Sequence, residues 1–345
     1  MTQSPALPDR FRDVEHLEDV MSTPSPALIA ALDELPGDIM VLGVGGKIGP
    51  SLAQLAKRAA PRKRVVGVAR FSEKDLREKL TEQGIECIEA DLLDRKQVDA
   101  LPKLANVVFM AGRKFGSSGY EDLTWAMNAH VPALVAEAFA QSRIVAYSTG
   151  CVYPYVDVRH GGATEVTPMT PPPGAYANSC VAREGMFRYF SRTCGTPGRI
   201  IRLNYAIDMR YGVLHDVAAK VFRGDPVDVT MGHVNVIWQG DANAQVLRCL
   251  ARCTTPTTPL NSTGLEALSV RTLATQLGER LGVPAKIVGR EAETALLSDA
   301  SEAARLFGAP SVPIETMLDW VADWVAHDGA SLGKPTKFEV RDGTF

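Results

Sequence analysis

Short apolar runs alternate with longer amphipathic stretches over the first 205 residues of the chain. The runs are four or five residues long, as expected of buried strands, and the stretches between them have helical spacing. Strands buried on both faces and separated by helices are typical of a parallel sheet with helices on each side. We therefore predict an α/β, doubly wound Rossmann-type sheet, with strands at 39–42, 64–68, 85–88, 107–110, 144–147 and 199–203 and helices at about 50–58, 73–82, 121–141 and 176–192.

Two segments flank this pattern. Residues 1–36 precede the first strand, and Ser22-Thr23-Pro24 offers a helix cap, so we interpret them as a helical extension that packs on the rest. After residue 205 the alternation weakens, and we expect further helices at 270–281 and 315–327. The predicted organisation is an extension at 1–36, an α/β domain at 37–205 and a smaller carboxy-terminal α/β lobe at 206–345. Within the lobe, residues 234–250 are expected to pack back onto the α/β domain.

Composition and charge exclude several classes of protein. The chain has 46% apolar and 22% charged residues, as globular proteins do, and its 37 Lys and Arg against 40 Asp and Glu give a net charge of -3. General binding to nucleic acid or to anionic membranes is therefore not expected. The six Cys lack CxxC spacing and the six His form no HExxH pattern, so no metal site is predicted. No signal peptide or membrane span is apparent, and we expect a cytoplasmic protein.

A glycine-rich loop with the sequence GVGGKIG, at 43–49, directly follows the first strand and opens a helix. Its glycines let the chain turn sharply, let the backbone approach a pyrophosphate and let the helix pack on the strand, while the helix amino terminus attracts the anion. In this strand–loop–helix context the loop predicts a dinucleotide site, whose contacts are Gly43, Gly46, Lys47, Ile48 and Gly49.

The end of the second predicted strand bears on which dinucleotide is bound. An acidic residue there would bond the ribose 2′-hydroxyl of NAD and repel a 2′-phosphate. The chain has Arg70 and Ser72 instead, a cation and a hydroxyl. We therefore expect NADP to be preferred, with NAD possible.

Six motifs in order resemble those of the extended short-chain dehydrogenase/reductase family, the group of NAD-dependent epimerases and dehydratases. They span about 38–281 and are the GxxGxxG loop, Asp91-Leu92-Leu93-Asp94, Val108-Phe109-Met110-Ala111-Gly112, Asn128, the segment 145–153 and Arg202-Leu203-Asn204-Tyr205. The resemblance implies that Asp91, Leu92, Ala111, Gly112 and Asn128 also contact the cofactor.

The resemblance further implies a pair of catalytic hydroxyls, Thr149 and Tyr176. In that family the Tyr phenol exchanges a proton with the substrate while hydride passes to or from nicotinamide, and the Tyr also lies against the cofactor. This chain departs from the family at the Lys that should follow four residues later, because Cys180 stands there. We keep Cys180 as a catalytic candidate; the alternative is an inert packing thiol. Arg183 is either a replacement cation or a surface residue.

The expected substrate is a carbohydrate-like alcohol or ketone: a sugar, sugar acid or nucleotide sugar. The segment 206–212 lacks the family's Gly-Pro pair, which favours a smaller sugar or sugar acid. Arg113 and Lys114 follow the fourth strand, at the edge where ligands of open sheets bind, and suit a carboxylate or phosphate. The substrate candidates are Arg113, Lys114, Ser148, Tyr153, Asn204 and Arg210.

We therefore expect an NAD(P)-dependent oxidoreductase or epimerase. The alternative is an NAD(P)-binding sensor or structural protein without turnover, suggested by the missing Lys. The helices at 121–141 and 176–192 carry more apolar residues than one core-facing stripe needs, which favours a homodimer.

Overall fold

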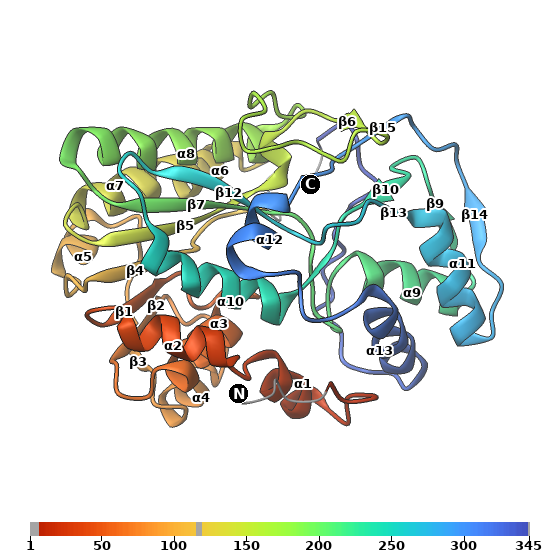
Figure 1. The fold of residues 1–345 in the computed structure, drawn as a ribbon, viewed down its shortest axis with the longest axis horizontal. Helices are drawn as coiled ribbons and strands as arrows, with labels where there is room; N and C mark the ends of the chain where they lie inside the picture. Colours follow the sequence, from red (N-terminus) through yellow and green to blue (C-terminus); the bar gives the residue numbers. More distant parts are fainter. Residues whose placement is uncertain (1–6, 115–118, 344–345) are drawn as a thin grey trace.

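A seven-stranded parallel sheet forms the centre of the computed structural model, which describes residues 7–114 and 119–343 (Figure 1). The strand order is β12-β7-β5-β4-β1-β2-β3. The predicted doubly wound α/β fold is confirmed. Because the order reverses between β1 and β4, the chain leaves a crevice at the carboxyl ends of these strands. The strands are β1 (Ile39–Leu42), β2 (Val65–Ala69), β3 (Glu86–Glu89), β4 (Asn106–Phe109), β5 (Arg143–Thr149), β7 (Gly198–Leu203) and β12 (Thr258–Ser262).

Helices cover both faces of the sheet (Figure 1). Alternate residues of β1 serve the two faces: Ile39 and Val41 pack in one apolar core, and Met40 and Leu42 in the other. The first core is covered by α2 (Pro26–Glu34), α3 (Gly49–Ala59), α4 (Leu76–Glu82), α10 (Gln239–Cys249) and α12 (Ser301–Phe307), and the second by α5 (Arg95–Ala100), α7 (Val131–Ala138) and α8 (Ala175–Cys194).

The single helix predicted at 121–141 is interrupted. It consists of α6 (Glu121–Trp125), a π-helical turn η1 (Ala126–His130) and α7. Pro132 has no N–H to give to the carbonyl of Asn128, four residues earlier, which favours the wider turn. Asn128 lies in this turn, fully buried, and its side chain holds both the N–H and the carbonyl of Arg113. The irregular turn thus positions the loop after β4.

A third apolar core organises the carboxy-terminal lobe around Trp238 and Trp320. Residues of the amino-terminal extension belong to it as well: Leu17 and Met21 of α1 (Val14–Met21) are buried there. The extension therefore has two helices, and α2 packs on the sheet instead. The domain boundaries stay a prediction. The lobe contains α9 (Val213–Arg223), α11 (Val270–Leu281), α13 (Ile314–Ala326) and the short strands β9 (Pro226–Asp228), β10 (His233–Val234), β13 (Leu268–Ser269) and β14 (Lys286–Val288).

Further short elements surround the carboxyl edge of the sheet. They are η2 (Gly150–Val152), β6 (Val156–Asp157), β8 (Ala206–Ile207), β11 (Ile237–Trp238), η3 (Leu250–Arg252) and β15 (Thr294–Ala295), of which β8 pairs with β11 and β6 with β15. None of the helices in the described residues combines the length and the apolarity that a membrane span needs.

Candidate active site

A cavity of about 480 Å³ lies where the strand order reverses, beyond the carboxyl ends of β1, β4, β5 and β7. A second hollow of about 230 Å³ adjoins it, since Gly46, Met110 and Gly112 line both. Of the residues predicted from the sequence, the first contains Gly46, Lys47, Ile48, Gly112, Arg113, Lys114, Ser148, Thr149, Tyr176 and Asn204, and the second contains Gly43, Gly46, Arg70, Ser72, Asp91, Leu92, Ala111 and Gly112. The fold thus brings most of them into one continuous groove.

The glycine-rich loop fits a dinucleotide. A Cβ on Gly43 would lie 2.6 Å from the backbone nitrogen of Ala111, and one on Gly49 would lie 2.2 Å from the carbonyl oxygen of Val44. Gly43 and Gly49 therefore allow the loop to pack closely against the neighbouring backbone. A Cβ on Gly46 would meet only the carbonyl of Gly43, at 3.5 Å, so the space in front of it is open to the groove. The amino terminus of α3 begins beside this space and favours an anion there.

The second hollow suits the adenosine end of a dinucleotide. Arg70 and Ser72 line it as predicted, on either side of Phe71, whose φ is 46°. Glu73 lines it too, and sequence reasoning missed this residue because it lies beyond the position at which an acid is usually sought. A carboxylate bonds a ribose hydroxyl and repels a 2′-phosphate, so Glu73 opposes the effect of Arg70.

Thr149 and Tyr176 meet in the larger cavity. Thr149 ends β5 and Tyr176 lies in the first turn of α8, and both side chains line this cavity. Burial raises the pKa of Tyr176 well above its ordinary value; the charge of Arg183 and the nearby Thr149 hydroxyl act in the opposite direction. The phenol is therefore protonated at neutral pH. Arg183 and Thr149 are the groups that favour its phenolate form.

Cys180 is fully buried among Val152, Tyr153 and Ala163. Burial raises the pKa of its thiol to about 11, although Arg183 and Tyr176 act in the opposite direction. A neutral thiol neither carries the positive charge of the family's Lys nor acts as a nucleophile at neutral pH. In this environment Cys180 supports Tyr176 by packing against it.

Arg183 is a buried cation in the wall of the cavity. It is 7% exposed, lines the cavity, and donates to the Tyr147 carbonyl at 3.1 Å and to Asn128 Oδ1 at 2.6 Å. Helical side chains lean toward the amino terminus, so a long side chain at 183 reaches back over the turn of residue 180. A Cβ on Gly112 would lie 2.3 Å from Arg183 Nη2, so only glycine leaves room for this guanidinium. Within the described residues Arg183 forms no ion pair with a carboxylate.

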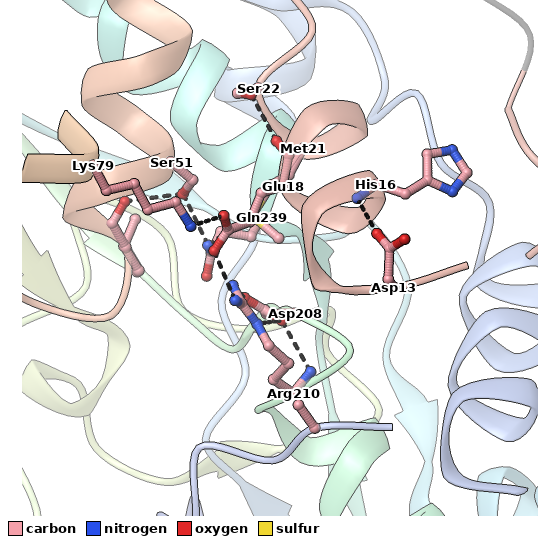
Figure 2. A network of polar contacts seen from close by, with 12 residues as sticks. Asp13, His16, Glu18, Met21, Ser22, Ser51, Lys79, Asp208, Arg210 and Gln239 are labelled. Carbon is pink, nitrogen blue, oxygen red and sulfur yellow. Dashed lines mark hydrogen bonds and ion pairs between the residues drawn. The ribbon is translucent and has the colours of Figure 1, made fainter. Parts of the chain in front are cut away.

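Two predicted substrate residues lie elsewhere. The Tyr153 hydroxyl donates to Asn261 and accepts from Arg202, in the buried layer behind the cavity. Arg210 forms a double hydrogen bond with Asp208 and an ion pair with Glu18 of α1, which also contacts Lys79 (Figure 2). These contacts hold the loop that precedes the cavity residues Tyr211 and Gly212.

Other residues of the cavity escaped sequence reasoning. Lys334 and Thr336 come from the carboxy-terminal segment, far from any motif, and only the tertiary fold brings them to the site. Tyr205, Tyr211 and Gln239 are further examples. In the described part of the chain, no three His, Cys, Asp or Glu side chains lie close enough together to hold a metal ion.

Comparison with known families and structures supports this geometry. Residues 39–207 match the model of the NAD dependent epimerase/dehydratase family, which confirms the resemblance seen in the motifs. No curated protein matches the chain significantly in sequence.

Three solved structures share the fold. DesIV, a dTDP-glucose 4,6-dehydratase from Streptomyces venezuelae solved with NAD and TYD bound, is 19% identical with a TM-score of 0.71, over 84% of this chain and 97% of that one. A UDP-glucuronic acid 4-epimerase from Bacillus cereus, solved with NAD, is 17% identical with a TM-score of 0.68, over 84% and 99%. A UDP-galactose 4-epimerase is 22% identical with a TM-score of 0.67, over 84% and 99%.

Lys47 yields a prediction about stability. Burial, and then the charges of Lys114 and Lys334, lower its pKa to about 7. A lysine whose pKa falls on folding destabilises the fold fully below about pH 7, and this penalty disappears as the pH rises toward the ordinary pKa of about 10.4. Lys47→Met should therefore raise the free energy of unfolding by about 1–3 kcal/mol near neutral pH, discounted for partial exposure, and the gain should shrink toward about pH 10. Denaturant titrations across this range measure it.

The exposed Lys96 provides the control, as Lys96→Met removes an equal charge from the surface. A gain for Lys47→Met that is equal at both ends of the pH range would contradict the prediction.

Proposed function

Because the dinucleotide-binding half of the chain, residues 39–207, belongs to the NAD dependent epimerase/dehydratase family, we propose that this protein is an NAD(P)-dependent oxidoreductase or epimerase of carbohydrate-like substrates. A bound NAD(P) would supply the hydride acceptor or donor. The observation that carries the proposal is the hydroxyl pair of Thr149 and Tyr176, which faces a cavity continuous with the dinucleotide groove. The nucleotide sugars named for the similar structures make this substrate class the first one to test.

The proposed roles of the residues follow from their chemistry. As the phenolate, Tyr176 accepts the proton of a substrate hydroxyl when the alcohol is oxidised; as the phenol, it gives a proton back when the ketone is reduced. Thr149 hydrogen-bonds the same oxygen and orients it. The guanidinium of Arg183 lies behind Tyr176 and favours the phenolate, because a nearby positive charge lowers the pKa of a phenol.

The alternative function is an NAD(P)-binding sensor or structural protein. The observation in its favour is the neutral, buried thiol of Cys180 at the position of the Lys. The buried Arg183 weighs against it, since a guanidinium directed at the cavity supplies the charge that the thiol cannot.

Assembly and location are proposals too. Tyr120, Trp125 and Tyr189 are large side chains exposed around α6 and α8, which supports a homodimer formed through these helices. All six cysteines are free, as expected in the reducing cytoplasm.

The proposed function predicts that the protein catalyses hydride transfer between NAD(P) and its substrate. Absorbance of NAD(P)H should change when the protein meets its substrate in a panel of nucleotide sugars, sugars, sugar acids and their keto forms. Tyr176→Phe should lower the rate about 10²- to 10⁴-fold, as expected for loss of general acid–base catalysis. Tyr189→Phe, on the exposed side of the same helix, should leave it unchanged. Cofactor binding without turnover of any compound would favour the sensor.

The second prediction concerns Arg183. Because Arg183 lowers the pKa of Tyr176, Arg183→Leu should raise that pKa and move the rising limb of the rate–pH profile toward higher pH by about one unit. Arg183→Lys should retain part of the effect. Arg192→Leu, which removes an exposed cation of the same helix, is the control. An unchanged profile in Arg183→Leu would refute the assignment.

The third prediction concerns the cofactor. If Arg70 and Ser72 receive a 2′-phosphate, NADP(H) should bind more tightly than NAD(H). Arg70→Ala should then reduce the difference by about 1.5–3 kcal/mol, the value of a charge-assisted hydrogen bond. Glu73→Gln should increase it, because a repelling carboxylate is removed. Fluorescence titrations with each reduced cofactor measure both. Tighter binding of NAD(H) to the unmutated protein would assign the cofactor to NAD.

A further inference from the structure

The uncharged polar side chains of the cavity wall differ in the hydrogen bonds that they can still make with a ligand. A hydroxyl or an amide can both donate and accept, but inside a protein its neighbours decide which of the two remains. A neighbour that only accepts, such as a carboxylate or a carbonyl, takes the proton and leaves the oxygen to the ligand. Three residues that line the cavity, Ser148, Gln239 and Thr336, are held in this way.

Ser148, near the end of β5, uses its hydroxyl proton in a hydrogen bond behind the cavity wall. Its Oγ lies 2.7 Å from Glu184 Oε1, and both side chains are buried. Glu184 forms an ion pair with Arg202, whose Nε and Nη2 donate to the two carboxylate oxygens at 2.9 and 2.8 Å. A carboxylate only accepts, so Ser148 is the donor of its bond to Glu184. Toward a ligand, Ser148 Oγ can therefore only accept.

Gln239, the first residue of α10, is held in the same sense (Figure 2). The Ser51 hydroxyl of α3 donates to the Ile48 carbonyl at 3.0 Å, so the Ser51 oxygen accepts from its other neighbours. The group of Gln239 that lies 3.1 Å from Ser51 is therefore the amide nitrogen, which also donates to the Met21 sulfur at 2.9 Å. With both N–H groups used, Gln239 offers a ligand its Oε1, which accepts.

Thr336 supplies a third acceptor, from the side of the lobe. Its backbone N–H and its hydroxyl both donate to Oδ2 of Asp216 in α9, at 2.7 and 2.6 Å. Because the same Asp216 oxygen accepts the N–H, the hydroxyl proton of Thr336 is directed at it as well. The lone pairs of Thr336 Oγ1 remain for a ligand. We call Ser148, Gln239 and Thr336 the acceptor set.

Thr149 has the opposite polarity. Its Oγ1 accepts the N–H of Cys151 at 3.2 Å, which leaves the hydroxyl proton to be donated. A donor at this position suits the oxygen of a reacting carbonyl, which only accepts. Two neighbouring residues of β5 thus offer a ligand different groups: Thr149 offers a donor, and Ser148 offers an acceptor.

The acceptor set restricts the chemistry of the ligand. The cationic side chains that also line the cavity are donors, so the set supplies the complementary half of its hydrogen bonds. Only a ligand with O–H or N–H groups satisfies these three oxygens. An apolar ketone would leave them unpaired, and a carboxylate or phosphate turned toward them would bring oxygen against oxygen. A site with buried polar groups discriminates strongly against ligands that leave those groups unpaired.

We propose that the acceptor set selects a sugar with several free hydroxyl groups, each of which donates to one of the three oxygens. This inference rests on the proposed function, because it takes Thr149 and Tyr176 as the reacting end of the cavity. It deepens that function, since the hydrogen-bond directions of this chain's own residues support a polyhydroxylated substrate independently of the similar structures.

Deoxyfluoro sugars test the proposal, because fluorine takes nearly the space of a hydroxyl group and accepts but does not donate a hydrogen bond. The probes are glucose and galactose, free and as UDP-sugars, with their monodeoxy and monodeoxyfluoro derivatives. Calorimetric titration into the complex with reduced cofactor measures their affinities. At two or more positions, replacement of the hydroxyl by either hydrogen or fluorine should weaken binding about 3- to 10-fold, as expected for one hydrogen bond. Fluoro derivatives that bind like their parents, or no binding of any parent sugar, would overturn the proposal.

Variants assign the hydroxyl groups to residues. In Ser148→Ala the loss of affinity caused by the replacement should disappear at one position of the sugar, and in Gln239→Met at another, because the acceptor for that hydroxyl is gone. The matched control is Ser142→Ala, at the opposite end of β5, where the hydroxyl donates to the Leu104 carbonyl at 2.7 Å. It should leave every loss as in the unmutated protein. Losses that persist in both Ser148→Ala and Gln239→Met would overturn the proposal.

The ribose hydroxyls of the cofactor are a second source of donors, and titration of the same variants with NADH and NADPH separates the two. Ser148→Ala and Gln239→Met should keep the cofactor affinity of the unmutated protein. Weaker cofactor binding together with unchanged sugar binding would assign the acceptors to the cofactor and overturn the proposal. Failure of the proposed function is recognised separately, because hydride transfer is then absent with every keto sugar although the parent sugars bind in the expected pattern.

Discussion

The site depends on one buried ion pair. Glu184 of α8 and Arg202 of β7 are 0% and 1% exposed and lie 2.8 Å apart. Such a pair is stable only when further hydrogen bonds satisfy both partners, and leaving one charge alone costs about 3–5 kcal/mol. Ser148 of β5 donates to Glu184, and Arg202 donates to the Tyr153 hydroxyl. The pair therefore fixes α8, which carries Tyr176, against β5, which carries Thr149, and against β7, which Asn204 directly follows.

The same ion pair limits how many further cations α8 can bury. With Glu184 neutralised by Arg202, a Lys at 180 together with Arg183 would place two further cations inside one buried helix face. The chain has one, Arg183, whose guanidinium is held by Asn128 and the Tyr147 carbonyl. Asn128 is itself positioned by the π-helical turn, and Gly112 leaves the space. Asn128, the Tyr147 carbonyl, the π-helical turn and Gly112 thus all help to accommodate one buried guanidinium.

Much of the sheet and the cofactor groove could be predicted from the sequence, because they depend on local patterns. β1 and α11 have the predicted bounds, and the glycine-rich loop connects β1 to α3, as the sequence pattern predicted. The π-helical turn was not foreseen, since Pro132 is also compatible with an unbroken helix. Tyr153 matched a motif at the edge of the site, yet its partners Asn261 and Arg202 come from distant strands. Lys334 carries no sequence signal, because only the tertiary fold brings the carboxy-terminal segment to the cavity.

Both ends of the chain make contacts near the cavity, but they differ in how many contacts hold them in place. Moving the lobe, together with α1, away from the sheet would break the ion pair of Glu18 with Lys79 and the contact of Gln239 with Met21 (Figure 2). Residues 333–335 of the carboxy-terminal segment, by contrast, are exposed, and their displacement breaks few of the hydrogen bonds among the described residues. A movement of this short segment therefore disrupts less of the structure than a movement of the whole lobe.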